Sequence, residues 1–297
     1  MKITLTGATG SVGKNLSNFL KDKGNHVLPL SLRNNWVLAK NAEAIVHLAG
    51  KAHDTKNTSA EEEYFKVNRD LTIQLFEQFL NSEIKDFFYF SSVKATADSV
   101  EGYLDETHLS NPQTPYGKSK QEAENYLLSK ELPVGKRLFI IRPCMIHGPG
   151  NKGNLNLLYK VVEKGIPYPL AAFENQRSFL SIDNLNFLIF EILKNRDVSS
   201  GIYNFADDNS ISTNELIRII GDASRIKSKL WRLPAGIISS VAKLGDVLKL
   251  PLNSERLKKL TESYVVSNQK IKTALGISEL PISVKKGLEK TIKSFKK

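Results

Sequence analysis

Cysteine is almost absent from this chain: Cys144 is the single cysteine among 297 residues. One thiol excludes an intramolecular disulfide and a metal site built from several cysteines, so the chain differs from the small disulfide-stapled secreted domains. A long uninterrupted apolar run is missing as well. The most apolar late stretch, residues 233–252, contains Lys243, Asp246 and Lys249, which indicates an amphipathic helix and not a membrane span.

Negative charge is scarce in the last quarter of the sequence. From Arg225 to Lys297 there are 17 Lys and Arg against 5 Asp and Glu, although the formal net charge of the whole chain is only +11. A basic region of this kind fits an anionic partner, which could be a nucleotide diphosphate, a nucleic acid or an anionic membrane surface. No basic platform interleaved with aromatic residues accompanies it, which argues against nucleic acid. For the tail from Lys285 onward, a solvated lysine-rich face is the simpler interpretation.

The length and composition fit a globular enzyme or binding protein. With 297 residues, 41% of them hydrophobic and 25% charged, the chain can form one large domain or a large and a smaller one. A core strand is predicted to begin at Met1, which leaves no room ahead of it for a signal peptide, so we expect a cytoplasmic protein. The sequence leaves open whether the protein works as a homodimer.

Strand and helix patterns alternate through the first half of the chain, which predicts a Rossmann-type α/β fold: a doubly wound parallel sheet with helices on both faces. The predicted strands are Met1–Thr6, His26–Leu32, Ala44–Ala49, Phe87–Ser91, Arg137–Arg142 and Gly201–Phe205. The predicted helices include Ser11–Lys21, Glu61–Leu80, Pro115–Lys130, Leu155–Lys164 and Asp183–Leu193. We expect residues 1–165, with 178–205 returning to them, to form the dinucleotide-binding domain. Residues 166–177 and 206–297 should form a smaller, mostly helical substrate domain.

Gly7, Gly10 and Gly13 have the spacing of a dinucleotide-binding turn between a strand and a helix. Glycine lets the backbone turn tightly there, approach a pyrophosphate and pack the helix against the strand. The positive end of the following helix attracts phosphate groups. We therefore predict that the cofactor contacts Gly7, Gly10, Ser11, Val12 and Gly13.

Tyr116 and Lys120 stand one helical turn apart in a second motif, Tyr-Gly-Lys-Ser-Lys. A lysine ammonium can stabilise a tyrosinate and so lower the phenol pKa from about 10 toward the working pH. The pair predicts a tyrosine that acts as a general acid or base.

These motifs resemble the extended short-chain dehydrogenase/reductase family, also called NAD-dependent epimerase/dehydratases, over essentially the whole chain. The landmarks that follow the family's order are the glycine turn, His47–Gly50, Val67–Asn68, Ser91–Ser92, Tyr116–Lys120, Arg142–Pro143 and Arg177–Phe179. A finer likeness joins the chain to a bacterial subgroup in surface-polysaccharide gene clusters. It rests on Ser91–Lys94, Gly150–Asn154, Pro169–Leu170, Asn175–Ser178 and Asp183–Asn184.

The resemblance implies a role for individual residues. Tyr116 would be the proton donor or acceptor, Ser92 would hydrogen-bond the reacting sugar oxygen, and Lys120 would hold the nicotinamide ribose. Asn68 would help to order the active-site helix. The remaining implied contacts are Ala49, Gly50 and Pro143 with the cofactor, and Asn154 and Arg177 with the diphosphate of a nucleotide sugar. Lys94 could also reach the substrate, although an exposed lysine is an equally good interpretation.

Two departures from the family pattern matter. Family members that hold NAD usually carry a carboxylate at the end of the second strand, but this chain has the neutral Ser31 there, followed by Arg33. An arginine suits the 2′-phosphate of NADP(H), so we expect NADP(H), with NAD as the alternative. His147 stands where a tyrosine is usual, and we expect it to be a loop histidine without a catalytic role.

We therefore expect a UDP-sugar 4-ketoreductase of surface-polysaccharide precursor synthesis, in which NADPH delivers hydride, Tyr116 protonates the developing alkoxide and Ser92 stabilises it. The close alternative is an NAD-dependent UDP-sugar 4-epimerase of the Glc/Gal or GlcNAc/GalNAc type, which would use the same residues. A non-catalytic dinucleotide sensor is a third interpretation, and the retained Tyr116 and Lys120 argue against it. No metal is expected at the site.

Overall fold

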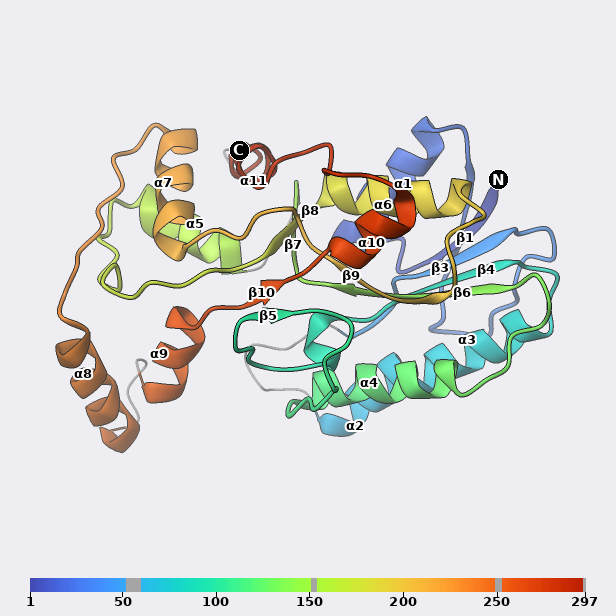
Figure 1. The fold of residues 1–297 in the computed structure, drawn as a ribbon, viewed down its shortest axis with the longest axis horizontal. Helices are drawn as coiled ribbons and strands as arrows, with labels where there is room; N and C mark the ends of the chain where they lie inside the picture. The colour runs from blue at the N-terminus through green and yellow to red at the C-terminus, as the bar shows by residue number, and fades with distance from the viewer. Residues whose placement is uncertain (52–59, 151–153, 249–252, 296–297) are drawn as a thin grey trace.

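A six-stranded parallel sheet forms the centre of the molecule (Figure 1). The computed structural model describes residues 1–51, 60–150, 154–248 and 253–295. The strand order is β2-β1-β3-β4-β6-β9. In chain order the strands are β1 (Lys2–Thr6), β2 (His26–Leu30), β3 (Ala44–His47), β4 (Asp86–Phe90), β6 (Arg137–Pro143) and β9 (Gly201–Phe205). The sheet and its parallel pairing confirm the predicted fold class.

Helices cover both faces of the sheet, because its strands carry apolar side chains on both sides (Figure 1). Helices α1 (Ser11–Asp22) and α6 (Ile182–Lys194) pack on one face, where Leu16 and Leu188 meet Phe88 and Phe139. Helices α3 (Leu71–Leu80) and α4 (Pro115–Leu128) cover the other face. The predicted helix over residues 61–80 is one helical run in three parts, with α2 (Glu61–Tyr64) and a π-helical segment, Phe65–Asp70, ahead of α3.

The connection between β2 and β3 contains no helix, since residues 31–43 form only bends and turns. The short connection puts β3 directly beside β1 on the side away from β2. The chain order therefore reverses direction at β1, and doubly wound sheets bind ligands at the carboxyl ends of the strands at such a point.

The rest of the chain adds a second, largely helical layer beyond the carboxyl ends of the strands. Helices α5 (Asn154–Glu163), α7 (Thr213–Ser224) and α11 (Val284–Lys293) share a separate apolar core. Ser212 caps α7 by accepting a hydrogen bond from the Glu215 N–H at 3.0 Å, as its spacing predicts. Helix α5 contributes to this core although the predicted boundary grouped it with the first domain, and the division into domains stays a prediction.

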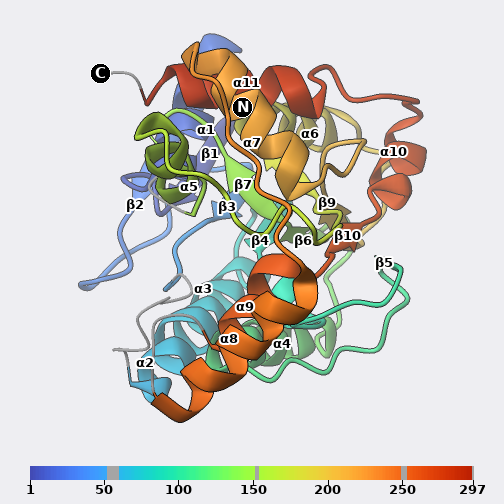
Figure 2. The ribbon, with the colours of Figure 1, turned by 90° about the vertical axis from the view of Figure 1, so that its left-hand side faces the viewer.

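Three further helices and four short strands belong to this layer in the described part of the chain. Helices α8 (Ala235–Leu248) and α9 (Ser254–Thr261) lie at its outer edge, and α10 (Gln269–Leu275) packs near β9 (Figures 1 and 2). The short strands pair as β5 (Tyr103–Leu104) with β10 (Val265–Val266) and as β7 (Met145–His147) with β8 (Phe179–Ser181). No helix in the described part of the chain has the length and apolar character to cross a bilayer.

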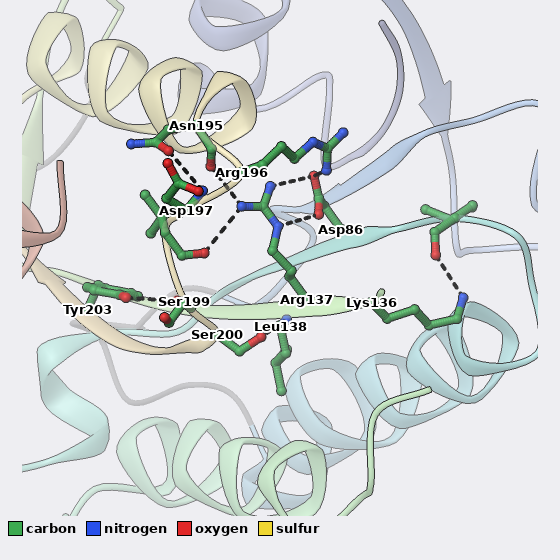
Figure 3. A network of polar contacts seen from close by, with 12 residues as sticks. Asp86, Lys136, Arg137, Leu138, Asn195, Arg196, Asp197, Ser199, Ser200 and Tyr203 are labelled. Carbon is green, nitrogen blue, oxygen red and sulfur yellow. Dashed lines mark hydrogen bonds and ion pairs between the residues drawn. The ribbon is translucent and has the colours of Figure 1, made fainter. Parts of the chain in front are cut away.

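A buried carboxylate fixes the amino ends of β4 and β6, opposite the end where ligands bind. Asp86 is fully buried, and Arg137 donates to both of its oxygens, at 2.8 and 3.0 Å. Arg196 adds a third hydrogen bond at 2.8 Å, so the carboxylate lies between two guanidinium groups (Figure 3). Arg137 also donates to the Asn195 carbonyl at 2.8 Å, which ties the end of α6 to the sheet.

We expect Arg137→Ala to lower the free energy of unfolding by about 3 kcal/mol, because it removes the bidentate partner of a buried carboxylate. Arg196 is 54% exposed, so Arg196→Ala, the matched control, should cost only about 0–1 kcal/mol. Urea denaturation of the three proteins measures both values. Equal small losses in the two variants would contradict this interpretation of the Asp86 cluster.

Candidate active site

The glycine turn brings the end of β1 against the end of β3. Gly7 has a φ of +67°, and a Cβ there would lie 2.8 Å from the Ala49 nitrogen, so no other residue fits this close approach. A Cβ on Gly13 would lie 2.2 Å from the Gly7 carbonyl oxygen, which explains the close packing of α1 on the turn. Gly10 is exposed at the amino end of α1, where no side chain caps the helix. This end keeps its backbone N–H groups for an anionic group, as a dinucleotide pyrophosphate requires.

A cavity of about 230 Å³ lies next to this turn, over the carboxyl ends of the strands. It brings together six of the residues predicted from the sequence: Val12, Gly50, Ser92, Tyr116, Lys120 and Pro143. The other lining residues are Leu48, Lys51, Phe90, Ser91, Cys144 and Ile146. Predicted cofactor residues and predicted catalytic residues therefore share one cavity.

The start of α4 positions Tyr116. Thr114 caps the helix by accepting from the Gly117 N–H at 3.2 Å, and Pro115 occupies the first turn, where it needs no N–H partner. The Tyr116 hydroxyl is hydrogen-bonded to the side chain of Ser92. The rings of Tyr116 and Tyr64 pack edge to face, with their centroids 6.3 Å apart. Ser92 itself accepts from the Lys94 N–H at 3.2 Å, which orients its hydroxyl at the end of β4.

Lys120 lies one turn further along α4 and is 4% exposed. Its ammonium donates to the Phe90 carbonyl at 2.8 Å, at the end of β4. A Cβ on Gly50 would lie 3.0 Å from Asn68 Oδ1 and 3.1 Å from Lys120 Nζ, so the glycine lets the backbone lie close to the ammonium. Gly50 and Lys120 both line the cavity, and a ribose hydroxyl bound there would be within reach of Lys120, as the family resemblance implies.

The pKa of Tyr116 moves in the direction opposite to our expectation. Burial raises the pKa of the phenol, and the hydrogen bond with Ser92 lowers it only in part. Lys120 is not among the groups that shift it, because its ammonium is directed to the Phe90 carbonyl. Burial lowers the pKa of Lys120 itself to about 8.

Asn68 connects the end of β3 to α4. Its side-chain oxygen accepts from the Lys51 N–H at 2.7 Å, and its amide nitrogen donates to the Lys51 carbonyl and to Ser119 Oγ, each at 3.1 Å. Asn68 is fully buried within the π-helical segment. These contacts support the predicted role of Asn68 in ordering the active-site helix, since Ser119 precedes Lys120.

A hydrogen-bonded chain through His47 was not foreseen from the sequence. Thr6 accepts from the Ala49 N–H at 3.0 Å and contacts His47 Nδ1 at 2.7 Å, while His47 Nε2 contacts Thr72 Oγ1 at 2.9 Å. Thr72 then donates to the Asn68 carbonyl at 2.8 Å. Burial lowers the pKa of His47 to about 3, so the ring is neutral, with one nitrogen accepting and the other donating. The sequence feature that could have indicated this chain of hydrogen bonds is the histidine at the end of the otherwise apolar strand β3.

A buried ion pair holds α4 on β6. Glu124 and Arg142 are 1% and 4% exposed, and Arg142 Nε donates to the two carboxylate oxygens at 3.0 and 3.1 Å. Arg142 Nη2 donates to the same carboxylate. Because Pro143 follows Arg142 in β6, this pair fixes the end of that strand relative to Tyr116 and Lys120.

Two of the predicted substrate residues, Lys94 and Arg177, do not line this cavity. Lys94 Nζ donates to the Asp98 carbonyl at 2.7 Å and lies 4.1 Å from the centre of the Tyr264 ring. Burial lowers the pKa of Lys94, the carboxylates of Asp98 and Glu262 raise it in part, and the positive charge of Arg177 lowers it. Arg177 donates to the Glu262 carbonyl at 3.3 Å and to the Lys259 carbonyl, so the two cations lie near each other beside α9.

The sequence analysis also singled out Asn154, Arg33 and His147. Asn154 begins α5, but its side chain lies outside the described residues, as do residues 151–153 of the same loop. Arg33 is exposed just beyond β2, and its N–H contacts Ser31 Oγ at 3.5 Å. His147 lies in strand β7 and not in a loop. It is buried, with Nδ1 2.9 Å from Thr291 Oγ1, and does not line the cavity.

The residues of this site fit a nicotinamide dinucleotide. The tight turn at Gly7 and the uncapped start of α1 suit its pyrophosphate, and the part of the cavity that Gly50 and Lys120 line suits its ribose. Pro143 and Val12 give the cavity an apolar wall, on which a nicotinamide ring can lie.

Comparison with known proteins agrees with this geometry. Residues 3–206 match the model of the NAD dependent epimerase/dehydratase family. A UDP-glucose 4-epimerase from Vibrio cholerae is 30% identical and aligns with 99% of this chain and 95% of its own. A UDP-2-acetamido-2,6-beta-L-arabino-hexul-4-ose reductase from Pseudomonas aeruginosa is 31% identical over 52% of this chain and 38% of its own. The structure of RMD from Pseudomonas aeruginosa complexed with NADPH has a TM-score of 0.76, with 18% identity and full coverage of both chains.

The family model extends over the whole sheet and the glycine turn, Ser92, Tyr116 and Lys120. The Vibrio relative aligns with the second layer as well. This chain is therefore an NAD(P)-dependent enzyme that belongs to the NAD-dependent epimerase/dehydratase family.

Proposed function

We propose that this enzyme is an NADP(H)-dependent 4-ketoreductase that acts on a UDP-linked amino sugar. The observation that carries the proposal is that Ser92, Tyr116, Gly50 and Lys120 line one cavity, in which the Tyr116 hydroxyl is hydrogen-bonded to Ser92. The bound cofactor supplies the hydride that reduces the keto carbon. Tyr116 gives its proton to the oxygen as negative charge develops there, and Ser92 donates a hydrogen bond to the same oxygen.

The protonation state of Tyr116 fits its proposed role as a proton donor. Because burial raises the pKa of its phenol above the ordinary value of about 10, Tyr116 keeps its proton at neutral pH.

The loop after β2 supports NADP(H). Ser31 provides no carboxylate for a ribose 2′-hydroxyl, and the exposed Arg33 is two residues away. A guanidinium there can pair with a 2′-phosphate.

The substrate class rests on charge and on the relatives. Lys94 and Arg177 are two cations near each other and suit a diphosphate, with Asn154 as a further proposed contact. The name of the Pseudomonas reductase identifies its substrate as a UDP-linked 4-keto amino sugar, and we propose a substrate of the same chemical class for this enzyme.

A UDP-sugar 4-epimerase is the second candidate, favoured by the Vibrio relative that aligns over nearly the whole chain. An epimerase takes hydride from C4 and returns it, so it retains NAD⁺ and consumes no external reductant. Native mass spectrometry distinguishes the two: tightly retained NAD⁺ would favour the epimerase.

Tyr116→Phe should lower turnover about 10²–10⁴-fold, because it removes the proton donor and keeps the ring that packs against Tyr64. The measurement is NADPH consumption with a UDP-linked 4-keto sugar, alongside the dissociation constants of both ligands, which should stay nearly unchanged. Near-wild-type turnover of the variant would exclude Tyr116 from the reaction. If the wild type consumes no NADPH but converts a UDP-hexose to its C4 epimer, the protein is an epimerase and the reductase proposal is wrong.

Arg33→Ala should weaken NADPH binding about ten-fold and leave NADH binding nearly unchanged, because only NADPH carries the 2′-phosphate. Ser31→Asp is the complementary variant, since its carboxylate should favour the free 2′-hydroxyl of NADH. Fluorescence titration of the wild type and both variants with each cofactor gives the six dissociation constants. Equal losses for the two cofactors in Arg33→Ala would show that another residue discriminates between them.

Cofactor affinity should fall as the pH rises through about 8, the pKa to which burial lowers Lys120. Below that pH Lys120 is an ammonium, and above it the positive charge and one donor are lost. We expect the dissociation constant to rise between pH 7 and 9.5. The Lys120→Met variant should bind weakly throughout this range without the same pH dependence. A flat wild-type profile would exclude Lys120 as the titrating contact.

A further inference from the structure

Helix α8 has two apolar faces, and only one of them is used inside the molecule. Ile238 and Ala242 are buried, where they pack with Leu257 of α9 and with Leu170. A second set of apolar side chains on the same helix is exposed: Ile237, Val241, Leu244 and Leu248 are between 47 and 59% accessible. Packing within the chain accounts for the first face and leaves the second without a partner among the described residues.

The exposed residues form one stripe. Their spacing of four, three and four residues places them on the same side of the helix. Trp231 is 54% exposed and Leu233 40% exposed directly before α8, so the apolar surface continues beyond the helix. The helix lies at the outer edge of the molecule beyond α9 in Figure 1 and at the front of the molecule in Figure 2. A continuous exposed apolar surface of this kind marks an interaction site.

The part of the chain that contains this stripe is basic in sequence, although Lys227 and Lys229 belong to the long connection from α7 and helix α8 itself carries one lysine and one exposed aspartate, Asp246. Residues 225–259 contain nine Lys and Arg against two acidic residues. Described basic side chains before, within and after α8 are exposed: Lys227, Lys229, Arg232, Lys243, Lys258 and Lys259. One of them, Lys259, pairs with Glu255 at 2.6 Å. The partner of the stripe must therefore accept apolar side chains and carry negative charge.

A second copy of this chain does not satisfy the charge requirement. In a two-fold symmetric dimer the same surface meets itself, so the basic residues around one stripe would face those around the other. The repulsion would oppose the burial of the apolar stripe. An anionic lipid surface meets both requirements, because its acyl region accepts apolar side chains and its headgroups attract lysine and arginine.

We propose that α8 lies on the surface of an anionic membrane. Ile237, Val241, Leu244 and Leu248 would enter the boundary between headgroups and acyl chains. Trp231 would lie at the interface, where an amphipathic indole is stable, and Arg232 would contact headgroup phosphates. None of these residues lines the cavity around Tyr116, so this binding does not depend on the proposed reaction.

The test is sedimentation of the full chain with lipid vesicles made of phosphatidylcholine alone or mixed with phosphatidylglycerol. We expect binding to the anionic vesicles, about ten-fold weaker binding to the neutral ones, and weakening by added salt. The double variant Ile237→Gln with Leu244→Gln should bind the anionic vesicles at least about ten-fold more weakly, because two apolar side chains no longer enter the interface.

Val37→Gln with Val134→Gln is the matched control, since these valines are 82 and 101% exposed on distant loops and should not affect binding. Circular dichroism melting checks that each variant is folded. Absence of wild-type binding to anionic vesicles, or equal binding by the α8 variant, would overturn the proposal. Light scattering that shows a dimer broken only by the α8 variant would also overturn it and assign the stripe to a second copy.

Discussion

The buried ion pair between Glu124 and Arg142 is the contact on which the active site depends most. It joins the helix that carries Tyr116 and Lys120 to the strand that ends at Pro143. Separating the two partners would leave a charge in a nearly dry environment, at a cost of several kcal/mol. Helix α4 therefore cannot slide along the sheet, and the distance between its tyrosine and the cavity wall is fixed before any ligand binds.

A network of neutral groups holds the other side of the cavity. The chain from Ala49 through Thr6, His47 and Thr72 ends at the backbone of Asn68. The Asn68 side chain then reaches both the loop after β3 and helix α4. These bonds need a neutral His47, and burial supplies that condition. One ion pair and one neutral relay thus position the catalytic and cofactor-binding elements together.

Local patterns in the sequence predicted the sheet and six residues of the cavity. Each of these depends on short-range chemistry: glycines in a tight turn, apolar strands, and a tyrosine and lysine one turn apart. The wrong expectation concerned the pKa of Tyr116, because no pattern shows that the Lys120 ammonium is directed to the Phe90 carbonyl. The hydrogen-bonded chain through His47 could not be predicted either, because local patterns do not show contacts between residues that are 41 and 25 positions apart.

The π-helical segment Phe65–Asp70 makes the exact number of residues in this helix important. A π-helical turn holds one residue more than an α-helical turn, so deleting a single residue there would restore a regular helix. The flanking helices would keep their orientation after that deletion, but the wider turn that contains Asn68 would be lost. The Asn68 amide would then leave Ser119 and Lys51. The helix could form without the extra residue of the π-helical turn. The contacts of Asn68 could not, so the extra residue serves the active site.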